Sequence, residues 1–507
     1  MNIFQRPISL RLFALILSIF TLVAYHVPFF KFVLANVESG LNGTVIVASL
    51  ALIMLAANFL VYYLILFLTR IAGKCILAFT FIANSLSLYF INTYDVFITN
   101  KMMGNVFNTR YSEASGFFSW TLIWYILFLG IIPCAYIFMQ RVDYGKWKKF
   151  GVNTGLSLGI TLLIALLNMS NWTWIDRNST KLGSIIMPWS YTVNTIRWWN
   201  GERARNKKEI PLPDATIAND SRDVCILIIG ESARRANFSL YDYDRPTNPL
   251  LAQDSVSALI AESAATYTTA GVKAILDHKD TGKLYEILPN YLYRNGVDVV
   301  WRSNNWGQPP LHIARYANVD DLKKQYPEAD SEHDGILFEG LRDLINESDS
   351  TKMLIVIHTS TSHGPTYNLK YPKEFEKFTP VCTTVEMSKA DQKELINAYD
   401  NTILYTDYLV HSAIEALREV PDRRGCVLFV SDHGESLGEG NLYMHGVPMS
   451  VAPKVQTEIP FIVWTNDSTL TVDPSMPVSQ YHVFHSVIDF LGIDSPIYDP
   501  TKTIFKN

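Results

Sequence analysis

The 507-residue sequence predicts two parts: an N-terminal α-helical membrane domain, and a C-terminal α/β domain with a central, mostly parallel sheet. Two observations support this prediction. Charged residues are sparse before residue 175, whereas most of the 48 acidic and 43 basic residues follow it. From Asp223 onward, short apolar runs alternate with longer amphipathic stretches, which is typical of a sheet covered by helices on both faces.

Five apolar runs in the first part are long enough to cross a bilayer, which takes ~20 residues. The first run also has the length of a signal peptide. No small-residue cleavage site follows it and four more runs do, so we interpret it as a retained helix. The predicted transmembrane helices are Leu10–Tyr25, Thr44–Leu68, Cys75–Tyr94, Phe117–Met139 and Val152–Trp174.

Basic residues predict the orientation of these spans. They lie before the first span, between the second and third, and between the fourth and fifth, and such segments favour the cytoplasm. These residues are Arg6, Arg11, Arg70, Lys74, Arg141, Lys146, Lys148 and Lys149. An odd number of spans then places the chain after Trp174 outside the cytoplasm. In a bacterium, this predicts a multi-pass inner-membrane protein with its second domain in the periplasm.

We assign residues 1–174 to the transmembrane domain, 175–215 to an interfacial linker, and 216–507 to the periplasmic domain. Two apolar pieces of the linker, Ile185–Trp189 and Ile196–Trp199, are rich in Trp. They are expected either to lie along the membrane interface, where Trp is favoured, or to pack against the soluble domain.

Composition excludes two classes of function. The formal net charge of −5 argues against nucleic-acid binding, which usually requires a basic face. The five cysteines are scattered, so the sequence shows neither a disulfide framework nor a cysteine-based zinc site.

The second part is predicted to contain five core strands and three long helical stretches. The strands are Val224–Ile229, Val297–Trp301, Met353–Ile357, Val427–Val430 and Phe461–Trp464. The helical stretches are Tyr285–Arg294, Gly335–Ile345 and Glu394–Glu419. Ligands of such sheets gather at the carboxyl ends of the strands, so polar residues that follow a strand are the candidates for a site.

Four polar stretches meet this condition or lie close to it. Asp432-His433 follows a predicted strand and offers a carboxylate oxygen beside an imidazole nitrogen, both of which Zn²⁺ accepts. Glu231 follows another strand after Gly230, which would let the chain turn tightly. The alternatives are an ordinary strand-end loop for the pair and an acid at a helix N-terminus for Glu231.

The other two stretches carry hydroxyl groups and histidines. Residues 265–271 contain several threonines before a helical run, where a Thr would act as a helix cap or, beside a metal, as a nucleophile. Ser362-His363-Gly364-Pro365 follows a strand, and His445-Gly446 follows the Asp432-His433 stretch.

In this order, the stretches resemble the phosphoethanolamine transferases of the alkaline phosphatase/sulfatase superfamily, which are membrane-anchored zinc enzymes that modify envelope glycans. The resemblance covers nearly the whole chain. Its most specific pieces are Gly230–Pro249, Ser362–Pro365, Tyr399–Leu409, Ser431–Glu439 and the loop Val106–Thr109.

The resemblance implies a zinc site formed by Glu231, Asp432, His433 and a nucleophilic Thr. The nucleophile corresponds to Thr268, with Thr269 as an alternative, because the match around Gly271-Val272-Lys273 is loose. One zinc is expected to be tightly bound, and a second is left open. His363 and His445 correspond to histidines that hold the substrate phosphate or a second zinc, and His445 is also expected to protonate the leaving group.

Asn305 and Asn108 are further predicted substrate-binding residues, on the motif Asn304-Asn305 and on the first-domain loop. This sequence lacks the basic residue that the family carries after that motif. Arg302, His312 or Lys273 would have to compensate. It also lacks the cysteines that flank the nucleophile in many relatives.

The predicted function is transfer of phosphoethanolamine from phosphatidylethanolamine to lipid A phosphate or another envelope glycan, through a phosphoethanolamine-threonine intermediate. Resistance to polymyxin would follow, because ethanolamine adds a cation to the envelope. The alternative is a phosphoglycerol transferase of the same superfamily. A sulfatase is disfavoured because the sequence has no Cys/Ser-x-Pro-x-Arg signature, and a transporter because the spans carry few charges.

Overall fold

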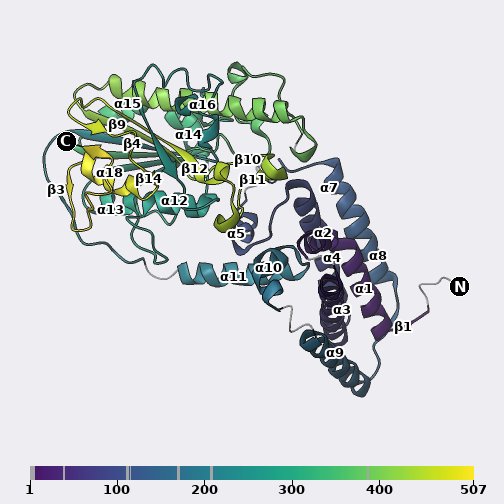
Figure 1. Cartoon of the computed structure of the whole chain (residues 1–507). Coiled ribbons are helices and arrows are strands. Elements are labelled where there is room, and N and C mark those ends of the chain that lie inside the picture. The colour runs from purple at the N-terminus through teal and green to yellow at the C-terminus, as the bar shows by residue number, and fades with distance from the viewer. Residues whose placement is uncertain are drawn as a thin grey trace. The chain divides into compact units, whose positions relative to one another are not determined.

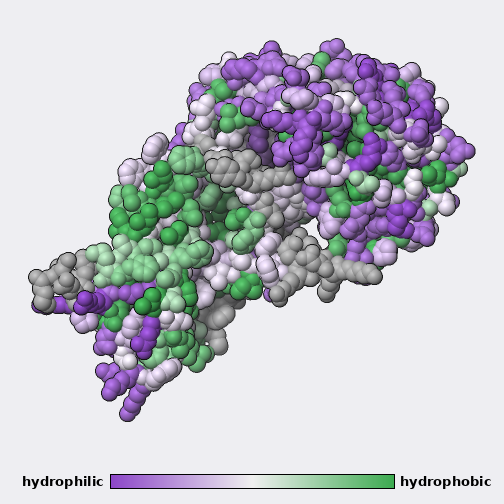
Figure 2. Space-filling view, turned by 180° about the vertical axis from the view of Figure 1, so that it is seen from behind, coloured by the Kyte–Doolittle hydropathy of each residue, from purple (hydrophilic) through white to green (hydrophobic). Residues whose placement is uncertain are grey.

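The computed structural model describes residues 6–37, 40–109, 114, 116–167, 172–205, 209–384 and 387–506 (Figure 1). It contains two compact units. The helical unit comprises the described residues up to Thr109 and those of Phe118–Asn200. The α/β unit comprises the described residues from Gly201 onward and the few between 114 and 117. Figure 2 shows apolar side chains gathered over the helical unit and hydrophilic ones over the α/β unit.

Four segments of the helical unit are long and apolar enough to span a membrane, and a bent helix pair raises the number to five. The four are α3 (Leu41–Thr69), α4 (Ile71–Tyr94), the continuous run Trp120–Met139 (α7 Trp120–Tyr125, a π-helical turn Ile126–Ile131 and α8 Ile132–Met139), and α9 (Trp147–Leu167). The pair is α1 (Leu10–Tyr25) and α2 (Val27–Asn36), bent by 62°. The prediction of five spans therefore holds if this pair forms one span.

The last predicted span, Val152–Trp174, corresponds in part to α9, which begins five residues earlier, at Trp147, and is described as far as Leu167. Residues 168–171 lie outside the described residues. Trp174 belongs to α10 (Trp172–Ile185), which is amphipathic rather than uniformly apolar.

The segments predicted to be cytoplasmic meet at one end of the helical unit. The short strands β1 (Ile8–Ser9) and β2 (Val142–Asp143) pair in parallel. Lys74 Nζ donates to the Gln140 carbonyl at 2.7 Å. This grouping is what a common side of the membrane requires of the N-terminal segment and of the second and fourth connections.

Helices α10 and α11 (Trp189–Arg205) pack on the helical unit over the described part of 175–200. Ile185 and Met187 are buried in the same core as the spans. Met187 N donates to His26 Nε2 at 3.1 Å, and Trp189 Nε1 donates to Asn58 Oδ1 at 3.0 Å. These contacts place Ile185, Met187 and Trp189 against the helical unit, and their position along the membrane interface remains a prediction. The assignment of 175–215 as a linker remains a prediction.

The α/β unit is built on an eight-stranded sheet with the order β14-β5-β12-β9-β4-β8-β6-β7. Strands β9, β4, β8, β6 and β7 run parallel, whereas β12 is antiparallel to both of its neighbours. The bounds are β4 Asp223–Gly230, β5 Ser257–Glu262, β6 Asp298–Ser303, β7 Arg315–Asn318, β8 Lys352–His358, β9 Arg424–Ser431, β12 Glu458–Thr465 and β14 Val478–Ser479.

The five predicted strands correspond to β4, β6, β8, β9 and β12, so the mostly parallel sheet is confirmed. Strands β5, β7 and β14 were not predicted. They lie toward the two edges of the sheet, and their residues are only partly buried, so their apolar pattern is weak. In contrast, every residue of β4 and β8 is buried.

Helices cover both faces of the sheet (Figure 1). One face carries α14 (Val319–Gln325), α15 (Leu341–Asn346) and α16 (Gln392–Arg418), and the other carries α12 (Thr268–Leu276), α13 (Leu288–Arg294) and α18 (His482–Phe490). The predicted helix Gly335–Ile345 is a 3₁₀ turn, Asp334–Phe338, followed by α15.

Short elements complete the fold. They are α5 (Asn100–Asn108), α17 (Lys454–Thr457) and the strand pairs β10 (Ser436–Leu437) with β11 (Tyr443–Met444), β13 (Thr471–Val472) with β16 (Phe505–Lys506), and β15 (Ile493–Asp494) with β3 (Thr216–Ile217).

Candidate metal and active site

The ends of two neighbouring parallel strands bring Glu231 and Asp432 together. Strands β4 and β9 pair in register up to Gly230 and Ser431, so the next residue of each strand emerges at the same edge. Asp432 N donates to the Gly230 carbonyl at 2.9 Å, which extends the pairing by one step.

The backbone geometry here differs from the expectation for Gly230. Ser232, not Gly230, adopts the left-handed conformation, with φ of 54°. A Cβ on Gly230 would lie 2.6 Å from the Phe429 ring, so the glycine is needed for close packing under the strand end.

Helix α12 brings Thr268 to the same point. A Cβ on Gly271 would lie 2.1 Å from the carbonyl oxygen of Asp432, so only glycine permits this approach. The first turn of the helix is thereby held against the strand end, with Thr268 at its first position.

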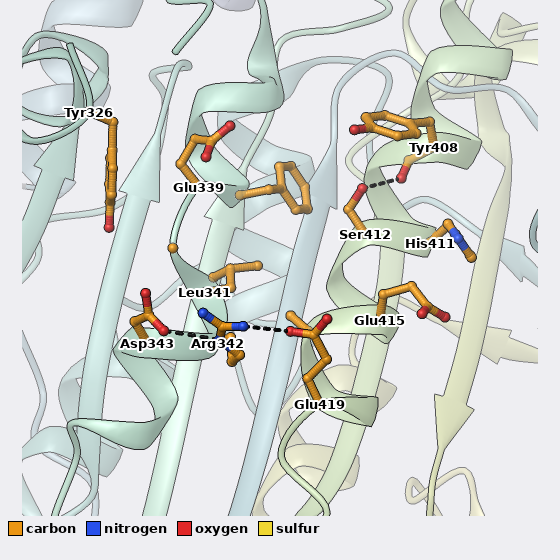
Figure 3. Close-up of a pocket in the computed structure, with 13 residues that line it drawn as sticks. Tyr326, Glu339, Leu341, Arg342, Asp343, Tyr408, His411, Ser412, Glu415 and Glu419 are labelled. Carbon is orange, nitrogen blue, oxygen red and sulfur yellow. Dashed lines mark hydrogen bonds and ion pairs between the residues drawn. The ribbon is translucent and has the colours of Figure 1, made fainter. Parts of the chain in front are cut away.

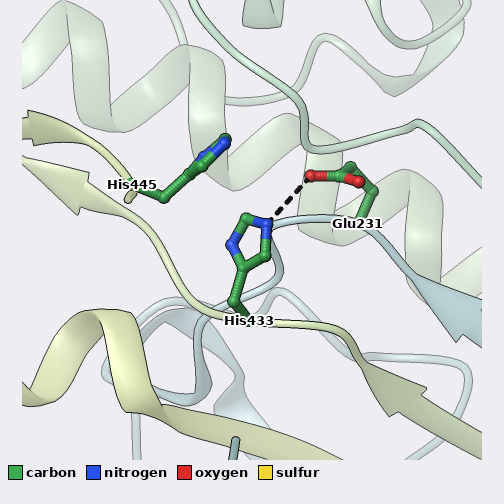
Figure 4. Close-up of side chains that lie close together, drawn as sticks. All are labelled: Glu231, His433 and His445. Carbon is green, nitrogen blue, oxygen red and sulfur yellow. Dashed lines mark ion pairs between the residues drawn. The ribbon is translucent and has the colours of Figure 1, made fainter. Parts of the chain in front are cut away.

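The four predicted metal ligands converge on one buried point. His433 Nε2 lies 3.4 Å from each of three atoms: Glu231 Oε1, Asp432 Oδ2 and Thr268 Oγ1. Thr268 Oγ1 also lies 3.2 Å from Glu231 Oε2. All four residues are buried. Figure 4 shows Glu231 and His433 facing each other, with His445 directed toward the same point.

These atoms fit a zinc ion in three respects. Ligand atoms of a tetrahedral site with bonds of about 2.0–2.1 Å lie about 3.3–3.4 Å apart, as they do here. His433 Nδ1 lies 2.9 Å from the Gly434 carbonyl, which can only accept a hydrogen bond. The Nε2 lone pair is therefore free for a metal. Asp432 Oδ2 is buried and has no hydrogen-bond partner, although buried carboxylate oxygens normally have one.

The electrostatics of the cluster also favour a cation. Burial disfavours the charged form of Glu231, but the imidazoles of His433, His363 and His445 outweigh it and hold the pKa of Glu231 below its usual value. Burial and the adjacent Glu231 raise the pKa of Asp432 well above its usual value. Burial lowers the pKa of His433 to about 4, so this imidazole is neutral. Asp432 therefore keeps its proton beside Glu231 unless a cation is present, and a bound cation would allow both carboxyl groups to ionise.

Thr268 is better placed than its neighbours to act as the nucleophile. No described hydrogen bond joins the Thr269 hydroxyl to Glu231, Asp432 or His433, whereas the Thr268 hydroxyl lies 3.2 Å from Glu231 Oε2. The Thr266 hydroxyl donates to the Val447 carbonyl at 2.7 Å and is therefore engaged elsewhere. Among these threonines, the described hydrogen bonds place only the Thr268 hydroxyl in the carboxylate and imidazole cluster.

The two predicted phosphate-site histidines lie beside the cluster. The His445 ring centroid is 4.2 Å from that of His433 and 5.6 Å from that of His363. Atoms of Glu231, His433 and His445 all lie within 4.8 Å of one another, so His445 is also a candidate metal ligand. Their roles in substrate binding remain predictions.

Sequence reasoning missed Glu435, which orients His445. Glu435 Oε2 lies 2.8 Å from His445 Nδ1, and Oε1 accepts a 2.8 Å bond from the Tyr367 hydroxyl. Burial raises the pKa of Glu435 to about 7. The sequence could have pointed to Glu435 through its position two residues after His433. Its partners His445 and Tyr367 lie 10 and 68 residues away in sequence, so the sequence did not show these contacts.

Asn305 contacts Glu231, one of the candidate metal ligands. Its Nδ2 donates to Glu231 Oε2 and to the Thr359 carbonyl, both at 2.8 Å. The structure thus shows Asn305 supporting a ligand, and its predicted role in substrate binding remains a prediction. Asn108 is the last residue of α5, and its side chain lies outside the described part of the structure.

The three residues proposed to replace the missing base are engaged elsewhere. Arg302 Nη1 donates to the carbonyls of Leu337 and Glu339 at 3.0 and 2.6 Å. Lys273 pairs with Asp277 one turn along α12, and His312 lies 3.5 Å from Glu209. None of these contacts directs a positive charge toward Thr268.

Another pocket of the α/β unit, about 600 Å³ in volume, does not show these features (Figure 3). Its Arg342 pairs with Asp343 and Glu419 at 3.0 and 3.4 Å. Beside it, Asp254, His411 and Glu415 form a second group of potential metal ligands. Arg418 already neutralises that group, since it pairs with both Asp254 and Glu415.

Comparison with known proteins agrees with this geometry. Residues 223–493 match the family described as Sulfatase, and residues 53–203 match the family described as Phosphoethanolamine transferase EptA/EptB. The chain is 35% identical over 519 residues to Phosphoethanolamine transferase EptA of Helicobacter pylori, with 99% of this chain and 98% of the relative covered. The chain belongs to the phosphoethanolamine transferases.

Other relatives place this transferase in the same family. It is 31% identical over 432 residues to Phosphatidylethanolamine transferase Mcr-1 of Escherichia coli, covering 79% of this chain and 80% of the relative. Among solved structures, it resembles the integral membrane protein lipooligosaccharide phosphoethanolamine transferase A (EptA) of Neisseria meningitidis, with a TM-score of 0.89 and 25% identity, covering 98% of this chain and 99% of that one.

The C-terminal periplasmic domain of the transferase EptC from Campylobacter jejuni matches at 33% identity with a TM-score of 0.51, over 58% of this chain and 97% of that domain. The predicted fold class and enzyme class are therefore confirmed. The transferase is a membrane protein with a sulfatase-like α/β domain.

Proposed function

We propose that this transferase moves phosphoethanolamine from phosphatidylethanolamine to a lipid A phosphate or related envelope glycan, with Thr268 as the nucleophile. The observation that carries the proposal is the position of Thr268 Oγ1, at 3.2 Å from Glu231 Oε2 and 3.4 Å from His433 Nε2. The names of relatives support the acceptor, since two are Kdo(2)-lipid A phosphoethanolamine 7''-transferases.

The proposed metal is one zinc ion, held by Glu231, Asp432, His433 and Thr268. Bound there, zinc would lower the pKa of the Thr268 hydroxyl and favour its ionised form. Asn305 and Gly434 orient two of these ligands, Glu231 and His433. A second zinc is left open by the position of His445, whose Nδ1 is occupied by Glu435 and whose other nitrogen is available.

The reaction proceeds in two displacements. Thr268 Oγ1 attacks the phosphorus of phosphatidylethanolamine, and the bond from phosphorus to the diacylglycerol oxygen breaks. His445 donates a proton to this oxygen, so diacylglycerol leaves and phosphoethanolamine remains on Thr268. An acceptor hydroxyl oxygen then attacks the same phosphorus, the bond from phosphorus to Thr268 Oγ1 breaks, and the proton of the acceptor hydroxyl passes to His445. The N–H groups at the start of α12, whose N-cap Tyr267 provides no side-chain cap, are the proposed donors to the phosphate in place of a lysine.

The proposed location is the bacterial inner membrane, with the α/β unit in the periplasm. Support comes from the basic connections that meet at one end of the helical unit, as cytoplasmic segments should. Both substrates are lipids, so the helical unit keeps the catalytic domain at the bilayer surface.

The test is the intact mass of the purified transferase after incubation with phosphatidylethanolamine vesicles and zinc. We expect a gain of one phosphoethanolamine group in the wild type and in Thr269→Ala, and no gain in Thr268→Ala. Loss of the adduct only in Thr269→Ala would move the nucleophile by one residue. An adduct formed from phosphatidylglycerol and not from phosphatidylethanolamine would establish the phosphoglycerol transferase instead.

A further inference from the structure

The helical unit contains a cavity that the proposed reaction does not use. It has a volume of about 380 Å³ and lies among the start of α5, helix α10 and helix α11. Hydrogen bonds to backbone carbonyl groups hold its walls together. Ile98 N donates to the Ser184 carbonyl at 3.1 Å, and Asn194 Nδ2 donates to the Ile98 carbonyl at 2.7 Å. The segment before α5 is thus attached to both of the later helices.

The lining of this cavity suits an anion. None of the eleven described residues that line it is acidic. Arg197 contributes the one charge of this lining, and the ion pairs of the described residues do not include it. Four hydroxyl side chains line the same cavity, those of Thr99, Ser179, Thr180 and Ser184, of which Ser184 donates to the Lys181 carbonyl at 2.7 Å. A guanidinium with several hydroxyl donors is typical of phosphate recognition.

The rest of the lining is apolar, so the ligand should be amphiphilic. Ile186, Trp189 and Val193 line the cavity together with the polar groups. Trp189 Nε1 is bonded to Asn58 on α3, so its ring is fixed beside a predicted span. Tryptophan is favoured at the level of lipid head groups.

The predicted topology places the cavity on the non-cytoplasmic side of the membrane. Residues 99–100 belong to the connection between α4 and α7, and residues 179–197 follow the last span, so both are predicted to lie on the non-cytoplasmic side. We propose that the cavity binds the phosphodiester head group of a phospholipid in that leaflet, with Arg197 on the phosphate. The lining shares no residue with the catalytic cluster, and the proposal rests on the predicted topology rather than on the proposed reaction.

Gly183 allows a direct test of the cavity. It lines the pocket, and a Cβ at this position meets no atom within 4 Å, so Gly183→Leu has room for its first side-chain atom and would reduce the cavity volume. The substitution also favours the helix, because glycine is a poor helix former. Gly159→Leu on α9 is the matched control, since its Cβ also meets nothing within 4 Å and it lies outside this lining.

The experiment uses the full chain in phosphatidylcholine vesicles with a trace of phosphatidylglycerol that carries a photoreactive acyl chain. Cross-linked peptides are mapped by mass spectrometry. We expect labelling of α10 and α11 peptides in the wild type and in Gly159→Leu, and at least about a ten-fold decrease in Gly183→Leu. Unfolding temperatures check that each variant is folded. Equal labelling in Gly183→Leu and the wild type would overturn the proposal.

Arg197→Gln tests recognition of the phosphate. Loss of one charge-assisted hydrogen bond should weaken labelling by the phosphatidylglycerol probe about ten-fold. Labelling by a photoreactive diacylglycerol, which has no phosphate, should not change. Arg141→Gln, an exposed cation at the opposite end of the unit, should change neither. Equal effects of Arg197→Gln on both probes would overturn the role of the phosphate. Displacement of the lipid probe by inorganic phosphate would show a free-phosphate site instead.

Discussion

Because residue 271 is a glycine, α12 can approach closely and place Thr268 beside the ends of β4 and β9. The helix approaches the Asp432 carbonyl so closely that an added methyl group would lie 2.1 Å from the oxygen. The proposed metal ligands are oriented by single hydrogen bonds, such as that of Asn305 to Glu231 and that of His433 to Gly434. At the scale of single residues, the site depends on a few close approaches rather than on many weak contacts.

Gly271→Ala should therefore separate Thr268 from the strand ends. We expect destabilisation of about 2 kcal/mol, as for other overpacked sites, and loss of most bound zinc. The measurements are the unfolding temperature and the zinc content of purified protein. Gly282→Ala is the control, because a Cβ there meets nothing within 4 Å. Normal zinc content in Gly271→Ala would contradict this account of the helix position.

Helix α16 shows how an element combines structural and electrostatic roles. Asp400 on this helix accepts bonds from Asn237, Tyr243 and Arg245, which lie in the segment after β4. Asp407, two turns further on, accepts the backbone N–H groups of Leu250 and Leu251, both at 3.0 Å. The helix thereby fixes residues 237–251, which follow Glu231 in the chain.

Asp407 should make stability depend on pH. Burial raises its pKa from 3.8 to about 6, so the folded state keeps this proton to a higher pH than the unfolded state. Its contribution to stability is therefore full below about pH 4 and decreases as the pH rises through 6. The shift corresponds to about 3 kcal/mol.

Asp407→Asn cannot titrate, so its stability relative to the wild type should increase between pH 4 and pH 7. The check is the difference in unfolding temperature between variant and wild type across this range, with the exposed Asp349→Asn as the surface control. A difference that stays constant with pH would contradict the assignment to Asp407.

Two units of different chemistry make up the whole molecule. The spans expose apolar side chains over most of their surface, with between 6% and 39% of each apolar window buried inside the protein. The α/β unit has its own core around fully buried strands. Joining them in one chain keeps the catalytic domain beside its lipid substrates, which raises their effective concentration.

A fragment of residues 216–507 should keep the metal site but lose efficiency on membranes. We expect normal zinc content and at least about a hundred-fold slower adduct formation from phosphatidylethanolamine in vesicles. With a short-chain, water-soluble phosphatidylethanolamine, the two proteins should react at similar rates. Equal rates on vesicles would mean that the helical unit does not deliver the lipid.

Features that depend on local sequence pattern could be predicted before the structure was known. Long apolar runs predicted the membrane unit, and short buried runs such as Val224–Ile229 and Val427–Val430 predicted the central strands. Because parallel strands end at one edge of a sheet, it also followed that Glu231 and Asp432-His433 would meet. The resemblance added Thr268, which the structure places beside them.

Features that depend on contacts between distant segments became visible in the three-dimensional structure. These include the antiparallel direction of β12, the packing of α10 and α11 on the helical unit, and the pairing of Glu435 with His445. The structure also shows that Asn305 donates a hydrogen bond to Glu231, which lies 74 residues away in sequence. Side-chain partners of this kind are set by how helices and strands pack together, and the order of residues along the chain carries no direct record of that packing.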